Sequence, residues 1–132
     1  MKICLISSSG GHYNQLCKLL TLREKYDVKI ITERTKYNSS DNRIDYFLDQ
    51  INRKEILFPL KFIKLIIISI KILLKEKPDV IISTGAIICI PFCYLAKKFG
   101  KKIIFIESFA KTDTATKTGK FVYKIADRFY VQ

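Results

Sequence analysis

Short apolar runs alternate along the chain with longer segments of helical periodicity. Ile3-Cys4-Leu5-Ile6 is an uninterrupted apolar run before a polar turn, as buried strands often are. Farther on, Leu16, Leu19 and Leu20 recur at helical spacing. The pattern predicts strands at residues 3–7, 28–32, 46–48, 80–83, 102–106 and 128–131. It predicts helices at residues 13–25, 59–76, 87–99 and 121–126, and polar segments at residues 33–43 and 111–120.

This order of elements indicates the fold class. Strands that alternate with helices favour right-handed βαβ units and a parallel sheet. Strands that are apolar on both sides fit a sheet covered on both faces. We therefore expect an α/β, Rossmann-like fold with a mostly parallel sheet and helices on both faces. A length of 132 residues predicts a single domain over residues 1–132.

The turn after the first predicted strand is the strongest candidate site. Ser9-Gly10-Gly11-His12 joins that strand to a predicted helix, and His12 is the one histidine of the sequence. Glycines let a backbone turn sharply and approach a ligand closely. The spacing is neither the dinucleotide fingerprint nor a P-loop. Two readings stay open, a phosphate or diphosphate site and a tight turn that carries a surface histidine.

Other polar segments are expected at the same edge of the sheet. Thr84-Gly85 and Glu107-Ser108 each follow a predicted strand. The carboxyl ends of parallel strands meet at one edge, where ligands of such folds bind. Glu107 is either a second catalytic carboxylate or a structural one that caps a loop or pairs with a lysine.

The predicted helix at 59–76 combines basic and apolar residues. At about 100° per residue its lysines fall on one narrow stripe, formed by Lys61, Lys64, Lys71 and Lys75. The rest of its circumference is apolar and wider than a surface helix usually buries. The helix either lies between the sheet and a neighbouring helix or lies at a membrane surface, with its lysines at anionic headgroups. Its longest uncharged stretch, residues 65–70, is far too short to span a bilayer.

Charge and cysteine content narrow the possible partners. The formal net charge of +12 calls for an acidic partner such as a phosphorylated substrate, anionic lipid or nucleic acid. The four cysteines form no C-x-x-C pair, so we expect core thiols in a reducing compartment, no metal site and no cofactor. The apolar run before the serines is too short for a signal peptide, so we expect a cytoplasmic protein.

Five segments match one family in the right order: Ser8-Ser9-Gly10-Gly11-His12, Ser83-Thr84-Gly85, Ile106-Glu107-Ser108-Phe109, Thr118-Gly119-Lys120 and the final run 125–132. The chain resembles the membrane-associated subunit of the split N-acetylglucosaminyltransferase that adds the second sugar to dolichol diphosphate. It looks still more like that subunit's bacterial counterparts in capsule and exopolysaccharide synthesis.

The resemblance implies the N-terminal half of a GT-B glycosyltransferase at the inner face of the cell membrane. A separate catalytic subunit would supply the other half and most of the UDP-sugar site. The acceptor would be a saccharide on a lipid diphosphate, held by the Gly10-Gly11-His12 turn, with His12 as base or as the group that orients the acceptor hydroxyl. The remaining residues expected at the acceptor are Ser9, Thr84, Gly85, Ser108 and Lys111.

The sequence departs from the family pattern at one position, and two other functions are possible. Lys111-Thr112 stands where the family usually has arginine and a hydrophobic residue, so the charge is kept without the planar fork of a guanidinium. We expect an inverting UDP-sugar transferase subunit that is inactive without its partner. The alternatives are a non-catalytic module that recruits an enzyme to the membrane and a basic nucleic-acid-binding domain. We expect no nucleic acid, because the lysines concentrate on an apolar helix and no aromatic-basic RNA-binding motif is present.

Overall fold

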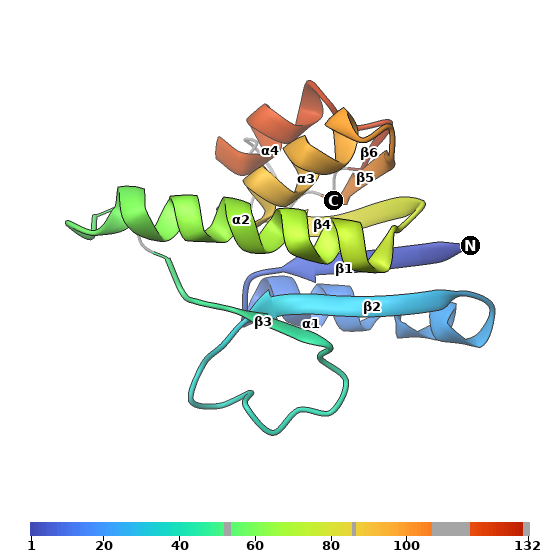
Figure 1. Cartoon of the computed structure of the whole chain (residues 1–132). Helices are drawn as coiled ribbons and strands as arrows, with labels where there is room; N and C mark the ends of the chain where they lie inside the picture. The colour runs from blue at the N-terminus through green and yellow to red at the C-terminus, as the bar shows by residue number, and fades with distance from the viewer. Residues whose placement is uncertain (52–53, 86, 107–116, 131–132) are drawn as a thin grey trace.

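A parallel sheet organises the molecule (Figure 1). The computed structural model describes residues 1–51, 54–85, 87–106 and 117–130. Its sheet has six strands in the order β3-β2-β1-β4-β5-β6, and every pairing among the described residues is parallel. The strands are β1 (Lys2–Ser7), β2 (Asp27–Glu33), β3 (Tyr46–Leu48), β4 (Val80–Gly85), β5 (Lys102–Ile106) and β6 (Arg128–Tyr130). The expected Rossmann-like fold with a parallel sheet is therefore confirmed.

Helices cover both faces of this sheet. The helical elements are α1 (Gly11–Cys17), the short 3₁₀ helix η1 (Leu20–Glu24), α2 (Phe58–Glu76), α3 (Cys89–Lys98) and α4 (Lys117–Tyr123). Because side chains alternate along a strand, Cys4 and Ile6 of β1 pack against α2 and α3. Ile3 and Leu5 of the same strand point to the other face, toward α1.

The first helix is shorter than the sequence predicts. Instead of one helix over residues 13–25, α1 ends at Cys17 and η1 follows. The N–H groups of Lys18, Leu19 and Leu22 donate to carbonyls three residues back, which tightens the backbone into 3₁₀ geometry. Leu19, Leu20 and Leu22 still pack against the core on the α1 face. The apolar spacing is therefore used for burial without a continuous α-helix.

Smaller differences lie at other element boundaries. β4 extends through Thr84 and Gly85, so these residues end the strand rather than follow it. α3 begins at Cys89, two residues later than predicted. α4 begins at Lys117, inside the segment predicted as polar, and ends at Tyr123. Ile125 and Ala126 continue in a turn, and their N–H groups donate to the carbonyl of Val122.

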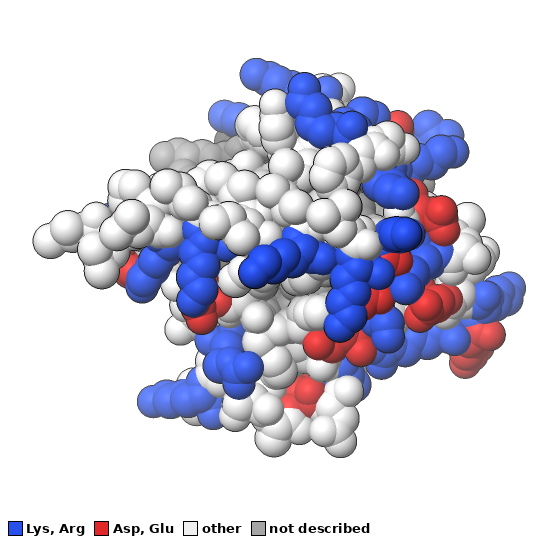
Figure 2. Space-filling view, in the orientation of Figure 1, with Lys and Arg blue, Asp and Glu red and all other residues white. Residues whose placement is uncertain are grey.

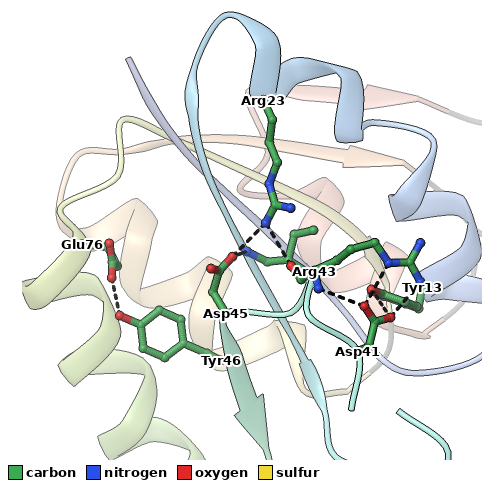
Figure 3. Close-up of polar contacts among 8 residues, drawn as sticks. Tyr13, Arg23, Asp41, Arg43, Asp45, Tyr46 and Glu76 are labelled. Atoms are coloured by element: carbon green, nitrogen blue, oxygen red, sulfur yellow. Dashed lines mark hydrogen bonds and ion pairs between the residues drawn. The ribbon is translucent and has the colours of Figure 1, made fainter. Parts of the chain in front are cut away.

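Three aspartates fix the register of the sheet in the same way. Each lies directly before a strand, and its carboxylate accepts the N–H of a residue on the neighbouring strand while its own N–H donates to that residue's carbonyl. The pairs are Asp79 with Lys2, Asp45 with Ile30 and Asp127 with Ile103, with N···O distances of 2.8–2.9 Å. Figure 3 shows Asp45, which also accepts a hydrogen bond from Arg23.

A second cluster in Figure 3 ties the polar segment before β3 to α1. Asp41 accepts hydrogen bonds from Tyr13 and Arg43, and the Arg43 guanidinium lies over the Tyr13 ring. Arg43 holds the pKa of the Asp41 carboxyl well below its usual range. The predicted polar segment at 33–43 is thus anchored at its far end, while Glu33 itself belongs to β2.

The long helix α2 is anchored at its C-terminal end. It ends at Glu76 because Lys77 adopts the left-handed conformation, with φ 49°, and Pro78 follows. The buried Glu76 carboxylate accepts a hydrogen bond from Tyr46 (Figure 3). It also lies 3.0 Å from the Lys2 ammonium. Among the described residues, no helix is both long enough and apolar enough to cross a membrane.

Candidate functional site

The Gly10-Gly11-His12 turn lies where the strand order of the sheet reverses, between β1 and β4. Ligands of doubly wound folds bind at the carboxyl edge of this switch point. The half-buried His12 ring reaches across it, and its Nδ1 lies 2.9 Å from the carbonyl oxygen of Thr84. In return the Thr84 hydroxyl donates to the carbonyl oxygen of His12 at 2.7 Å. This reciprocal pair joins the start of α1 to the end of β4.

The contact with Thr84 determines the tautomer of a neutral His12. A carbonyl oxygen can only accept a hydrogen bond, so Nδ1 must carry the proton. The lone pair of the neutral ring is then on Nε2, for which the described residues provide no hydrogen-bond partner. Nε2 is therefore available to accept a proton from a ligand.

Gly85 is required beside this ring. Its φ of +121° is a conformation that residues with a side chain rarely adopt. A Cβ built at Gly85 would lie 3.2 Å from Cε1 of His12 and 3.4 Å from its Nδ1. The absence of a side chain at Gly85 thus leaves the space that the His12 ring occupies.

Ser9 is bound by a carboxylate that the sequence did not indicate. The Ser9 N–H and hydroxyl both donate to Oε1 of Glu33, at 3.1 and 2.7 Å. Glu33 is the last residue of β2, so its carboxylate belongs to the same edge of the sheet. It places a negative charge next to the turn and uses the two Ser9 groups that an anionic ligand would otherwise meet.

The remaining predicted residues fall into two groups. Gly10, with φ 78°, makes the turn, and Gly11 is the first residue of α1. Glu107, Ser108 and Lys111 lie outside the described residues. The structure thus brings Ser9, Gly10, His12, Thr84 and Gly85 together at one edge, and their contacts with an acceptor stay predictions.

The cysteines are core residues, as expected. Cys4, Cys89 and Cys93 are buried, and Cys17 is half-buried. Burial raises the pKa of the Cys4 and Cys89 thiols to about 12, so neither is a reactive thiolate near neutral pH. The described residues include no group of three His, Cys, Asp or Glu side chains that could hold a metal ion.

Figure 2 shows basic side chains along one side of α2. Lys61 pairs with Glu55 and Lys64 pairs with Asp49. Lys71 is exposed, and the Lys75 ammonium lies 5.6 Å from the centre of the Tyr46 ring. The predicted stripe therefore exists, with two of its four charges paired inside the chain.

Solved structures with a similar fold include MurG and a UDP-GlcNAc 2-epimerase. MurG from Acinetobacter baumannii superimposes with a TM-score of 0.77 at 16% identity, over 100% of this chain and 46% of that chain. UDP-GlcNAc 2-epimerase from Methanocaldococcus jannaschii superimposes with a TM-score of 0.77 at 20% identity, over 99% of this chain and 39% of that chain. At these identities the likeness shows the fold alone.

Sequence relatives are more specific. The human UDP-N-acetylglucosamine transferase subunit ALG14 is 24% identical over 100% of this chain and 75% of its own length. The corresponding subunit of Schizosaccharomyces pombe is 43% identical, over 42% of this chain and 29% of its own length. The family model described as "Oligosaccharide biosynthesis protein Alg14 like" matches residues 49–132, which is more than half of the sequence. The chain therefore belongs to the Alg14-like family of oligosaccharide biosynthesis proteins.

Proposed function

We propose that this chain is the acceptor-side subunit of a UDP-sugar glycosyltransferase that works with a separate catalytic subunit. The relatives that support the proposal are themselves named as subunits of UDP-N-acetylglucosamine transferase. The observation that carries it is the His12 ring, held by Thr84 at the switch point with Nε2 unused. The chain would form one acceptor-binding domain, residues 1–132. The partner would bind the UDP-sugar.

His12 supplies the chemistry that this reaction needs from the acceptor side. Nε2 takes the proton of the acceptor hydroxyl while the hydroxyl oxygen forms a bond to the anomeric carbon. The bond between that carbon and the diphosphate oxygen of the donor breaks, UDP leaves, and the anomeric centre inverts. Gly10 and Gly11 let the backbone approach the diphosphate of a lipid-linked acceptor. Lys111 would add positive charge there, and Glu107 would act as a second base or orienting group.

The α2 lysines would keep the complex at the inner face of the cell membrane. Each basic residue near an anionic surface contributes about 1 kcal/mol to binding. On α2 these lysines lie beside exposed apolar residues, among them Leu60, Ile63 and Ile67. This combination is typical of a helix that lies in a membrane interface. The acceptor is embedded in the same membrane, so peripheral attachment would bring the His12 site to its substrate.

Reconstitution tests the proposed reaction. The chain is co-expressed with candidate catalytic subunits, and sugar transfer from several UDP-sugars to a lipid-diphosphate acceptor is measured. We expect no transfer by the chain alone and transfer by the correct pair. In that pair His12→Ala should lower kcat about 10²-fold or more if His12 is the base. Loss of the hydrogen bond to Thr84 in this variant should lower the free energy of unfolding by only about 1 kcal/mol.

His12→Gln is the matched variant. Glutamine can still donate to the Thr84 carbonyl but cannot take up a proton near neutral pH. A near-normal rate in this variant would assign His12 to positioning rather than to base catalysis. Full activity of His12→Ala would remove His12 from the site.

A non-catalytic recruiting module is the second candidate. The observation that favours it is the reciprocal hydrogen bonding of His12 and Thr84, which by itself ties α1 to β4. Under this reading His12→Ala would lower the melting temperature while the pair transferred sugar at its normal rate and remained on membranes.

A further inference from the structure

An open groove of about 400 Å³ lies between α2, α3 and α4. Around the circumference of α2, a stripe of exposed apolar residues separates this groove from the lysines. The volume of the groove is within the range of about 300–1,000 Å³ that is usual for small-molecule sites. The surface that the described residues give to the groove is apolar throughout. It is lined by Phe62, Ile66, Ile90, Pro91, Tyr94, Leu95 and Phe121.

The surface around the groove is also apolar. Ile63, Ile67 and Leu74 are 54%, 48% and 59% exposed and lie, around the helix, between the groove and the lysines. Tyr94 and Phe121 pack with ring centres 6.3 Å apart and are themselves 43% and 37% exposed. Figure 2 shows this uncharged surface over α2, continuing toward α3 and α4. An exposed apolar area bordered by charge marks an interaction site.

The groove is close in the chain to the His12 site. Ile90 and Pro91 lie in the first turn of α3, and Ile90 is five residues after Gly85. Five residues span at most about 18 Å, so this end of the groove is near the edge where His12 lies. The C-terminal end of α3 carries positive charge, where the Lys98 ammonium lies 5.3 Å from the Tyr94 ring centre. Lys120 and Lys124 of the neighbouring segment are exposed.

The chemistry of the lining indicates the kind of occupant. An extended protein segment brings backbone N–H and C=O groups, which need partners once they are buried. The described residues that line the groove offer no polar surface for them, whereas a hydrocarbon chain requires none. A long hydrocarbon chain therefore fits the groove better than an extended segment of another protein.

We propose that this groove holds the hydrocarbon chain of the lipid-diphosphate acceptor next to α3 while its diphosphate reaches the Gly10–His12 turn. The proposal rests on the proposed acceptor-side function and deepens it. It makes the chain of the lipid a recognised part of the substrate. Acceptor affinity would then depend on the lipid chain even without a membrane.

Tryptophan fluorescence can test binding without sugar transfer, since the sequence contains no tryptophan. Tyr94→Trp places a reporter in the groove, and Ile63→Trp places a control on the exposed stripe of α2. Farnesyl diphosphate, which is water-soluble, is added in the absence of vesicles. We expect a saturable blue shift for Tyr94→Trp, no shift for Ile63→Trp, and no shift of either reporter with inorganic pyrophosphate.

Adjacent residues of α2 give a matched pair for the binding surface. Ile66 lines the groove, whereas Ile67 is exposed outside it. In the Tyr94→Trp protein, Ile66→Gln should weaken farnesyl diphosphate binding about tenfold or more, and Ile67→Gln should change it less than twofold. Circular dichroism verifies that both variants are folded. Equal effects of the two substitutions would overturn the proposal.

Three other results would also overturn it. One is quenching of both reporters by vesicles of brominated anionic phospholipid with no response to farnesyl diphosphate, which would mean that the face only enters the bilayer. Another is a Tyr94→Trp response to the partner subunit alone, which would assign the groove to protein docking. The third is no response to any probe. If farnesyl diphosphate binds in the groove but the reconstituted pair transfers no sugar, the groove remains a binding site for a lipid chain and the proposed function is rejected.

Discussion

The carboxyl edge of the sheet and the outer face of α2, α3 and α4 are built in opposite ways. At the edge, two of the predicted site residues have polar partners within the chain, Ser9 in Glu33 and Nδ1 of His12 in Thr84. On the outer face, large apolar side chains such as Leu60 and Ile63 are more than half exposed. The edge is therefore preorganised before any ligand arrives, whereas the outer face is left to be covered by something else.

The edge and the outer face therefore differ in how far they depend on their surroundings. A preorganised site loses activity when one atom is out of place, because small displacements are costly to catalysis. An apolar face tolerates single changes but requires a partner or lipid of matching chemistry. Substitutions at the edge should therefore affect turnover sharply, and substitutions on the face should affect binding in graded steps.

Apart from the His12 variants, the largest effect is expected from Gly85→Ala at the edge. The new Cβ would contact the His12 ring and the backbone would be strained at φ +121°. We expect about 1–3 kcal/mol of destabilisation and a 10- to 10²-fold loss of kcat in the reconstituted pair. Thermal unfolding and initial rates measure the two effects.

Gly100→Ala is its control. Gly100 also has positive φ, at +77°, but a Cβ there would have no atom within 4 Å. This variant should lose stability and retain its kcat. If both variants lose activity alike, the edge is not preorganised around His12.

A medium effect is expected from the lysine margin of the outer face. Among the described residues no carboxylate pairs with Lys71 or Lys75, whereas Lys61 and Lys64 are paired. At about 1 kcal/mol per lysine, Lys71→Gln with Lys75→Gln should weaken binding to anionic vesicles about tenfold or more. The Lys61→Gln, Lys64→Gln variant should lose less, about threefold. Equal binding of all proteins to anionic and neutral vesicles would mean that the stripe has no membrane role.

The smallest functional effect is expected at Glu76, which anchors α2 to the sheet. Hydrogen bonding from Tyr46, together with Lys2, lowers the pKa of Glu76. The resulting stabilisation is present above the unfolded value of about 4.3 and is lost as pH falls through the lower folded value. Glu76→Gln should cost about 1–3 kcal/mol at pH 7, and the difference from the native protein should shrink below about pH 4.

Chemical denaturation at several pH values measures this difference. Groove binding and kcat should stay within about twofold, since Glu76 touches neither region. A stability difference that does not change with pH would show that the charge of Glu76 is not what anchors the helix.

The sheet could be predicted from the sequence because its signals are local. Apolar runs such as that of β1 identify strands, and Pro78 and Gly100 identify helix ends. The edge could be located because parallel strands place their carboxyl ends together. The break after α1 could not be predicted, because no glycine or proline lies between Cys17 and Leu20 and only the packing of the leucines requires it.

The contacts within the site were beyond sequence reasoning for a related reason. His12 was noticeable as the one histidine, next to two glycines. Its bond to Thr84 joins residues 72 positions apart, and the Ser9–Glu33 contact joins residues 24 positions apart. A glutamate at a strand end carries no local signal for such a role. The wide apolar face of α2 was predicted from its periodicity, but the groove was not, because its other walls come from α3 and α4, which only the fold brings together.

The aspartates before β3, β4 and β6 have a consequence for length variation in this protein. Each sets the register of its strand by a pair of hydrogen bonds to one residue of the neighbouring strand, as Asp79 does with Lys2. A residue inserted between Asp79 and Val80 would either break both bonds or slip the strand, and a slip of one residue turns every side chain to the opposite face. Insertions and deletions should therefore be excluded at these three junctions, while surface loops accommodate the differences in length among relatives.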